Sequence, residues 1–404
     1  MVYKLKKSLY GLRQSPRVWY NKIETYFGQE GLEKCPHEHT LFVKHKTDGR
    51  IIVVSLYVDD LIFTDNDQKL FDEFKSSMER NFAMTDLGKM RYFLGVEMKE
   101  DNNGIFLHQQ KYAIEILQRF GMYDCNSVSN PIVPGSRLQK DETGQASNAT
   151  IYKQMVGCLM YLLATKPDLA FSICLVARYM ERPTDIHMTV VKRILRYLKG
   201  TASYGLRYER GKGEELVGWS DSDYAGDIDD RRSTSGYVFM IGTKAVSWSS
   251  KKQPIVILST TEAKFIAAAS SACQGICLSR ILAQIDTKGK GYITIYCDNS
   301  SSIKLSKNPV MHGRSKHIDA RFHFLRDLTK DGTIQLVHCS SFEQVADIMT
   351  EALSFENFSR NRDKLSLCTL ELGGEEVFDC PPREAIQVFS DDNRGVSFSR
   401  VVKL

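Results

Sequence analysis

The sequence predicts a mixed α/β and α+β protein in which a helical region joins two regions that contain sheets. Three observations support this fold class. Up to about residue 133, short β-rich runs alternate with amphipathic helical segments. Helical segments then follow a polar stretch at 134–150. From about residue 214, three strand-like runs precede alternating helices and strands, which is the order of one compact domain with a mixed sheet.

Length and composition exclude several classes of protein. The 404 residues are enough for two or three domains, and the net charge of +5 permits a nucleic-acid partner without requiring one. The ten cysteines show no CxxC pair and no spaced Cys/His quartet, so neither a zinc site nor a disulfide framework is indicated. No apolar run approaches ~18 residues, and the N-terminus lacks the apolar core of a signal peptide. We therefore expect no membrane span and no secretion.

The first elements are a helix and a hairpin. Ser15 is a candidate N-cap, and Pro16 stands at the first helical position of "SPRVWYNKIETYFGQ". The segment "IIVVSLYVDDLIFTD" places Asp59 and Asp60 between two apolar runs, which predicts a β-hairpin. From these two acids alone, a simple turn is the more frequent explanation. An exposed carboxylate pair also suits Mg²⁺ held with substrate phosphates, a site that needs another carboxylate from elsewhere in the chain.

The middle of the chain predicts a linker followed by helices. Residues 134–150 are polar and rich in loop-forming residues. In the helical segment "TVVKRILRYLKG", one side is apolar and the other carries Lys192, Arg196 and Lys199. Such a basic stripe can follow a phosphate backbone, although a solvated helix face is the more common explanation.

Four acids of the last region fall at the ends of predicted elements: Asp221, Glu262, Asp298 and Asp347. A single acid at such a place is usually a helix cap or a turn residue, and Glu262 could pair with Ser259 in a capping box. Acids on different elements of one sheet can nevertheless meet at one edge. There they could bind two Mg²⁺ ions that activate water and steady the leaving oxygen in phosphodiester cleavage.

Longer motifs carry a family resemblance. "GWSDSDYAGDIDDRRSTSGYVFMIG", "STTEAKFIAAA", "IYCDNSSSIKLSKNPVMHGRSKHIDARFHFLRD" and "QVADIMT" closely resemble the ribonuclease H domain of copia-type LTR retrotransposon Pol polyproteins. "SLYGLRQSPRVWY", "LYVDDLIF" and "RYFLGVEM" are similar to the reverse transcriptase of the same family. The resemblance covers roughly residues 2–355, in family order.

The resemblance implies a domain plan. Residues 1–133 would be part of a reverse transcriptase palm and thumb, and 134–212 a linker and helical connection. Residues 213–355 would be a ribonuclease H-like domain with a mixed five-stranded sheet. The segment 356–404 shows no strong periodicity, and we expect a loosely ordered tail of unknown role.

The resemblance also assigns the nuclease residues. Asp221, Glu262, Asp298 and Asp347 match the catalytic acids that hold two Mg²⁺ (or Mn²⁺) ions, and Asp223 is a secondary candidate. Relatives usually read "STTEAEY" where this chain has Lys264. Because Lys264 lies two helical positions after Glu262, we expect its side chain to point away from that acid. Glu351 stands where relatives commonly have Lys, and we expect weaker substrate contact there.

For the polymerase, the resemblance matches Asp59 and Asp60 to the YxDD box, with Asp59 the expected metal ligand. Arg13 and Gln14 match the segment beneath the templating base and the incoming nucleotide. In the family another palm Asp precedes "VYKLKKSLYGL", and it is not in this sequence. We therefore expect the polymerase to be inactive unless a partner chain supplies that residue.

The implied substrate is an RNA/DNA hybrid, recognised by shape and by the 2′-OH and cleaved in its RNA strand. The residues expected to position it through phosphates are Lys192, Arg196, Lys199, Lys316 and His317. A histidine often assists product release in this fold, and the candidates are His312, His317 and His338. Other retrotransposon-encoded proteins are possible partners, in a cytoplasmic virus-like particle or the nucleus. The alternative is an inert nucleic-acid-binding remnant of a decayed element, but the presence of every catalytic acid favours an enzyme.

Overall fold

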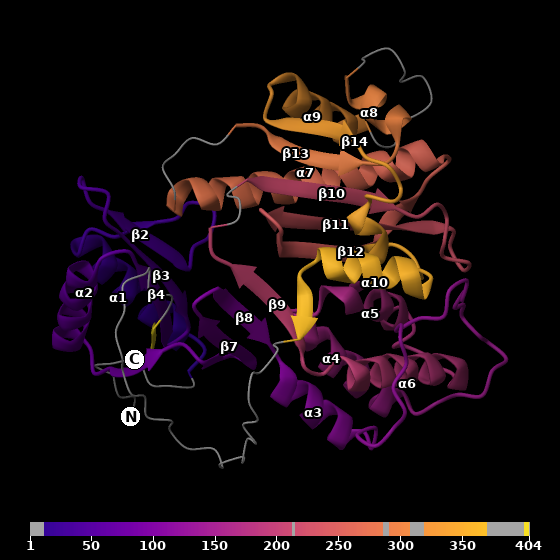
Figure 1. The fold of residues 1–404 in the computed structure, drawn as a ribbon, viewed down its shortest axis with the longest axis horizontal. Helices are drawn as coiled ribbons and strands as arrows, with labels where there is room; N and C mark the ends of the chain where they lie inside the picture. The colour runs from indigo at the N-terminus through magenta and orange to yellow at the C-terminus, as the bar shows by residue number, and fades with distance from the viewer. Residues whose placement is uncertain (1–11, 212–214, 286–290, 308–318, 370–399, 404) are drawn as a thin grey trace, which may run out of the picture. The chain divides into compact units, whose positions relative to one another are not determined.

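The computed structural model describes residues 12–211, 215–285, 291–307, 319–369 and 400–403 (Figure 1). The chain divides into two compact units. The first unit consists of residues 1–93, 280–289 and 375–404, and the second of residues 94–279 and 290–374.

The first unit is built on an antiparallel sheet with the strand order β1-β2-β3-β4-β16-β5. Its elements are α1 (Ser15–Gln29), β1 (Glu33–Lys34), β2 (Leu41–His45), β3 (Ile51–Tyr57), β4 (Asp60–Asp65), α2 (Gln68–Asn81), β5 (Thr85–Lys89), β6 (Tyr92–Phe93) and β16 (Arg400–Lys403). The predicted hairpin of residues 51–65 is present as β3 and β4.

Every second side chain of β3 is buried, and these side chains pack the hairpin against α1 and α2. Ile52 and Val54 of β3 are fully buried, and they belong to one apolar cluster with Phe27 of α1 and Phe74 of α2. Burial of a side chain of this size stabilises the fold by about 1.5–3 kcal/mol. The β3–β4 hairpin, whose turn contains Asp59, is therefore anchored by a packed apolar core.

The second unit contains the expected five-stranded mixed sheet. Its strand order is β12-β11-β10-β13-β14, in which β10, β11 and β12 are antiparallel and β10, β13 and β14 are parallel. These strands are β10 (Leu216–Ser222), β11 (Arg232–Ile241), β12 (Lys244–Val256), β13 (Ile293–Cys297) and β14 (Ile334–His338). A second sheet in this unit has the order β15-β9-β8-β7.

The remaining elements of the second unit surround these sheets. They are β7 (Val96–Asp101), β8 (Gly104–His108), α3 (Gln110–Arg119), α4 (Ala149–Leu162), η1 (Pro167–Leu169), α5 (Ala170–Ala177), α6 (Asp185–Gly200), β9 (Tyr204–Glu209), α7 (Thr260–Ile285), α8 (Ser300–Lys307), α9 (Asp319–Lys330), η3 (Val345–Met349), α10 (Phe355–Lys364) and β15 (Leu367–Thr369).

Both faces of the five-stranded sheet are covered. Val238 and Met240 of β11 are buried in one apolar cluster with residues of α4, α5 and α6. Between them, Phe239 points to the other face, where its ring lies against Gly275 of α7. This alternation is the two-residue period of a β-strand, and it places α7 along the sheet beside β10 (Figure 1).

Helix α7 is the one helix among the described residues that is long and apolar enough to cross a membrane by length and composition. Its buried residues include Phe265, Ile266 and Ala272. A buried core helix passes the same test, and α7 also carries Glu262 and Lys264. We therefore interpret α7 as the core helix of the second unit.

A buried lysine joins the helical region to β9. Lys166 is 0% exposed, and its Nζ donates hydrogen bonds to the carbonyl oxygens of Thr201 (2.6 Å) and Tyr204 (3.1 Å). Burial lowers the pKa of Lys166 to about 8, against the opposing effect of Asp168. Asp168 in turn accepts a hydrogen bond from the buried Tyr197 hydroxyl at 2.5 Å. The structure thus buries the ammonium group of Lys166 in an environment that disfavours its charged form.

Residues 94–133 group with the second compact unit and not with the β3–β4 hairpin, because α3 packs in the cluster of α4 and α6. The predicted domain boundary at residue 133 stays a prediction. The expectation of a loose tail is wrong for residues 356–369, which form most of α10 and all of β15. Phe358 and Leu367 are buried there, and β15 pairs with β9. Residues 370–399 lie outside the described part of the chain. The nine described cysteines are free thiols.

Candidate active site

Two of the predicted acids meet because their strands are parallel neighbours. Asp221 is the second-to-last residue of β10, and Asp298 directly follows β13. The register pairs Trp219 with Tyr296, two residues before each acid. Since parallel strands end at the same edge of a sheet, both carboxylates are delivered to one place. Asp221 is buried, and the side chain of Asp298 is 15% exposed.

The side chain of Lys264 lies between these two acids. Its Nζ is 2.7 Å from Oδ1 of Asp221 and 2.5 and 2.6 Å from the two carboxylate oxygens of Asp298. The sequence prediction concerned only the direction of Lys264 relative to Glu262. From its position on α7, the four-carbon side chain of Lys264 reaches two other acids of the predicted site, at the strand ends that α7 crosses. Burial disfavours the Lys264 charge, but Asp221 and Asp298 outweigh this effect and raise its pKa above the ordinary value.

The short helix η3 brings a third predicted acid to the cluster. Burial and the neighbouring charges of Asp221, Glu351 and Asp298 raise the pKa of Asp347 to about 8. Thr350, at the end of η3, donates a hydrogen bond from Oγ1 to Oδ2 of Asp221 at 2.5 Å. The side chain of Thr350 therefore fixes the Asp221 carboxylate from the side opposite to Lys264.

Glu351 extends this negative cluster. Its side chain retains exposed surface, yet partial burial and the nearby Asp221 carboxylate raise its pKa, while Lys264 lowers it. Sequence reasoning placed Glu351 at the rim of the substrate site and did not assign it to the acids. The sequence interpretation also did not assign Lys264 and Thr350 to the site. The sequence indicates them only by position, since Lys264 is two residues after Glu262 and Thr350 is three residues after Asp347.

Glu262 makes the contacts of a helix cap. Its Oε2 accepts a hydrogen bond from the Leu258 N–H at 2.9 Å, and its own N–H donates to Oγ of Ser259 at 3.2 Å. The bond to Ser259 Oγ is one half of the capping-box alternative, whereas the Glu262 carboxylate accepts from Leu258 and not from the Ser259 N–H that a complete box would use. A metal-binding role for Glu262 remains a prediction.

The secondary candidate, Asp223, is held by β11. Its Oδ1 accepts a hydrogen bond from the Thr234 N–H at 2.5 Å. Burial raises the pKa of Asp223 to about 6, with a smaller contribution from Asp221, while the Thr234 N–H and Arg178 oppose the rise. Its backbone contact gives Asp223 a structural role beside the cluster.

The close packing of η3 against β11 depends on a glycine. Gly236 of β11 lies opposite Asp221 in the strand register. A Cβ atom at Gly236 would lie 2.5 Å from Cβ of Met349 and 2.8 Å from Cγ2 of Thr350. The absence of a side chain therefore lets η3, with Asp347 and Thr350, rest on the sheet.

We expect Gly236→Ala to destabilise the chain by about 1–3 kcal/mol, since overpacking forces backbone or rotamer shifts. The measurement is the free energy of urea unfolding. The matched control is Gly157→Ala on α4, where nothing lies within 4 Å of the added Cβ. That change should stabilise the helix by about 0.5–1 kcal/mol. An unchanged urea midpoint for Gly236→Ala would show that the packing of η3 against β11 does not require a glycine at this position.

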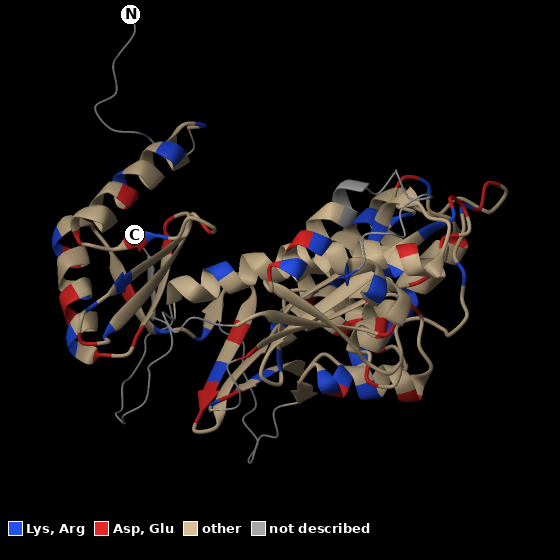
Figure 2. Cartoon of the chain, turned by 90° about the horizontal axis from the view of Figure 1, so that it is seen from above, with Lys and Arg blue, Asp and Glu red and all other residues tan. Residues whose placement is uncertain are grey.

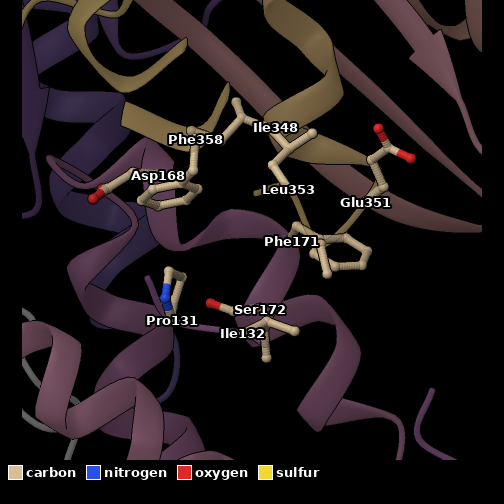
Figure 3. Close-up of a pocket in the computed structure, with 10 residues that line it drawn as sticks. Pro131, Ile132, Asp168, Phe171, Ser172, Ile348, Glu351, Leu353 and Phe358 are labelled. Atoms are coloured by element: carbon tan, nitrogen blue, oxygen red, sulfur yellow. The ribbon is translucent and has the colours of Figure 1, made fainter. Parts of the chain in front are cut away.

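A small cavity that is partly open to solvent is lined by residues of α5, η3 and α10 (Figure 3). Phe171, Leu353 and Phe358 contribute apolar surface to it. In Figure 3 the carboxylates of Asp168 and Glu351 point to opposite sides and away from the middle of the cavity. The cavity therefore offers no convergent polar groups, and we do not place the chemistry there.

The polymerase-type acids lie at the hairpin turn. Tyr57 of β3 pairs with Asp60 of β4, so Val58 and Asp59 form the turn. Val58 has φ 54°, an uncommon value for a β-branched residue, and its carbonyl oxygen accepts a hydrogen bond from Trp19 Nε1 at 2.6 Å. The other two residues of this prediction, Arg13 and Gln14, are exposed at the start of α1.

The basic stripe of α6 is only partly free for a ligand. Lys192 is exposed, but Arg196 Nε donates to the Asn126 carbonyl at 2.8 Å, and Lys199 Nζ lies 4.2 Å from the centre of the Tyr123 ring. Lys and Arg are also interspersed with Asp and Glu in both units (Figure 2). Charge alone therefore does not mark a nucleic-acid face, and the role of this stripe stays a prediction.

The predicted residues of the "SKHIDAR" segment and one histidine fall outside the described residues: Lys316, His317 and His312. His338 is exposed at the end of β14, where it pairs in register with Cys297, the residue before Asp298. This places one histidine candidate at the same sheet edge as the acids.

Within the described ranges, no group of three or more His, Cys, Asp or Glu side chains is arranged as a metal site. At the sheet edge, the ammonium of Lys264 occupies the position between Asp221 and Asp298 where a metal ion would bind. The carboxylates still converge on one cation position. They therefore fit a cation, provided that Lys264 moves.

Comparison with known proteins gives matches over nearly all of the chain. Residues 1–134 match the family model described as reverse transcriptase (RNA-dependent DNA polymerase). The chain is 38% identical over 365 residues to the retrovirus-related Pol polyprotein from transposon RE2 of Arabidopsis thaliana. That match covers 89% of this chain and 25% of the relative, so the chain spans about a quarter of the length of this relative.

Two further matches have high coverage of the other protein. A putative transposon Ty5-1 protein of Saccharomyces cerevisiae is 30% identical, over 68% of this chain and 89% of the relative. Among solved structures, an LC11-RNase H1 in complex with an RNA/DNA hybrid matches with 12% identity and a TM-score of 0.26. That match covers 34% of this chain and 94% of the solved chain.

Proposed function

Because this chain belongs to the Pol polyproteins of copia-type retrotransposons, we propose that its second unit cleaves the RNA strand of RNA/DNA hybrids with the help of Mg²⁺ or Mn²⁺. The observation that supports this proposal is the meeting of acids from separate elements at one sheet edge. Asp221 comes from β10, Asp298 follows β13 and Asp347 lies in η3.

The cation position between the strands is the proposed centre of the reaction. Asp221, Asp298 and Asp347 would hold the metal, with Glu262 as the fourth ligand from α7. Bound metal supplies an activated water and neutralises charge on the phosphate that is cleaved. The three distances from Lys264 Nζ, between 2.5 and 2.7 Å, support this assignment because they mark where a cation is already bound.

The other residues of the site hold these carboxylates in place. The Thr350 hydroxyl donates to Asp221, so one carboxylate oxygen is fixed and the other faces the cation position. The Leu258 N–H orients Glu262 at the start of α7. Preorganised carboxylates of this kind lower the cost of reorganisation during the reaction.

The experiment is cleavage of a labelled RNA/DNA hybrid by the full chain in 1–20 mM Mg²⁺, with EDTA and Asp298→Asn as controls. We expect RNA fragments that disappear with EDTA and in the variant. Cleavage that survives Asp298→Asn would point to a contaminating nuclease. A folded chain that cleaves nothing at any Mg²⁺ concentration would contradict the proposed activity.

One observation favours a second candidate, a nucleic-acid-binding protein without catalysis. Lys264 already neutralises the acids, so the site is electrostatically satisfied without metal. Hybrid binding with no cleavage, measured by fluorescence anisotropy at several salt concentrations, would favour this candidate.

We do not include polymerisation by this chain alone in the proposed function. Asp59 lies in the hairpin turn and Asp60 begins β4, and the described residues offer no three-ligand acidic group around them. A primer-extension assay on the purified chain tests this part of the proposal. Incorporation that disappears in Asp59→Asn would contradict it.

A further inference from the structure

The Lys264 side chain makes contacts that resemble those of a bound cation. Its Nζ has three carboxylate oxygens within 2.7 Å, from Asp221 on β10 and from Asp298, which follows β13. The side chain is 17% exposed, and the carboxylates that it contacts are 7% and 15% exposed. Water therefore screens these charges weakly.

A metal ion and this ammonium cannot share the position. Mg²⁺ binds oxygen ligands at about 2.0–2.1 Å, so an ion between Asp221 and Asp298 would lie almost on top of Lys264 Nζ. Two cations at such separation repel strongly at any local dielectric. Entry of metal thus requires the lysine to break three charge-assisted hydrogen bonds.

We propose that Lys264 is a tethered cation that competes with divalent metal for the position between Asp221 and Asp298. Its ammonium balances the acids when metal is absent, and it must leave the site before metal binds. This inference rests on the proposed function for the identity of the metal, but it concerns binding and not the cleavage step.

The test compares metal binding by the full wild-type chain, Lys264→Met and Lys264→Arg. Met keeps the length of the side chain and removes its charge, and Arg keeps the charge. Binding of Mn²⁺ is measured by isothermal titration calorimetry, with NaCl added to keep the ionic strength equal. We expect Lys264→Met to bind Mn²⁺ at least tenfold more tightly than the wild type, and Lys264→Arg to bind no more tightly.

Thermal unfolding gives a second readout. Without metal, Lys264→Met should melt at a lower temperature than the wild type, because Asp221 and Asp298 then repel each other without a counter-charge. Added Mg²⁺ should restore the melting temperature of the variant and change that of the wild type much less. Equal metal affinity in the wild type and Lys264→Met would overturn the proposal.

A third readout needs no variant and remains available if Lys264→Met does not fold. An amine-acetylating reagent is applied to the wild type with and without Mg²⁺, and modification of Lys264 is followed by mass spectrometry. Displacement by metal should increase the modification of Lys264 relative to Lys251, which is exposed. Protection of Lys264 that persists at saturating metal would overturn the proposal.

These results separate the inference from the proposed function. Tighter metal binding by Lys264→Met without hybrid cleavage would support the tethered cation and contradict the nuclease activity. Cleavage by the wild type, together with equal metal affinities in the wild type and Lys264→Met, would support the nuclease activity and contradict the tethered cation.

Discussion

Replacing Asp221 by Asn should reduce the rate of hybrid cleavage by roughly 10³-fold, measured at Mg²⁺ concentrations that saturate the wild type. The carboxylate of Asp221 is central to the site, since one of its oxygens faces Lys264 and the other accepts from Thr350. Loss of several kcal/mol of metal-centred stabilisation corresponds to about this factor, at 1.36 kcal/mol for each tenfold change.

The fold should survive this substitution, because Asn retains an oxygen for the Thr350 hydroxyl and Asp298 still pairs with Lys264. Circular dichroism and the melting temperature check this point. The control is Asp124→Asn, which changes an exposed acid and should leave cleavage unaffected. Activity of Asp221→Asn within threefold of the wild type would contradict the assignment of the site.

The second large effect concerns stability and pH. The buried Lys166 has a folded-state pKa of about 8, below the unfolded value of about 10.4. Between these values the unfolded chain binds more protons than the folded chain, so stability rises as pH rises. From pH 7 to 9.5 this lysine should contribute a gain of roughly 2 kcal/mol, at 1.36 kcal/mol per pKa unit.

The measurement is the free energy of urea unfolding at pH 7 and at pH 9.5 for the wild type and Lys166→Met. The variant cannot titrate at this position, so the gain should be smaller in it by roughly 2 kcal/mol. Lys153→Met, on the exposed face of α4, is the control and should follow the wild type. Identical pH profiles for Lys166→Met and the wild type would show that Lys166 remains charged when buried.

Local sequence patterns were sufficient for much of the fold. The hairpin of residues 51–65 is encoded by β-branched runs on both sides of two turn-forming acids, and the structure contains it as β3 and β4. The five-stranded mixed sheet also follows from the order of its segments, because strand and helix periodicity are local properties. The same patterns place Asp221 and Asp298 at strand ends.

What could not be predicted depends on contacts between distant residues. The segment 367–369 is too short to show strand periodicity, and it becomes β15 only by pairing with β9. Arg196 looked free on its helix, but its partner, the Asn126 carbonyl, comes from a loop 70 residues earlier. Likewise, the position of Lys264 depends on how closely α7 crosses β10 and β13, which no local pattern specifies.

The position of Lys264 also makes the site sensitive to a very small genetic change. Lysine codons become glutamate codons by substitution of the first base alone. In this fold that substitution replaces the ammonium between Asp221 and Asp298 with another carboxylate, and it reverses the sign of the charge at the centre of the cluster. A single point mutation in either direction thus separates a site that carries its own cation from one that must take a cation from solution.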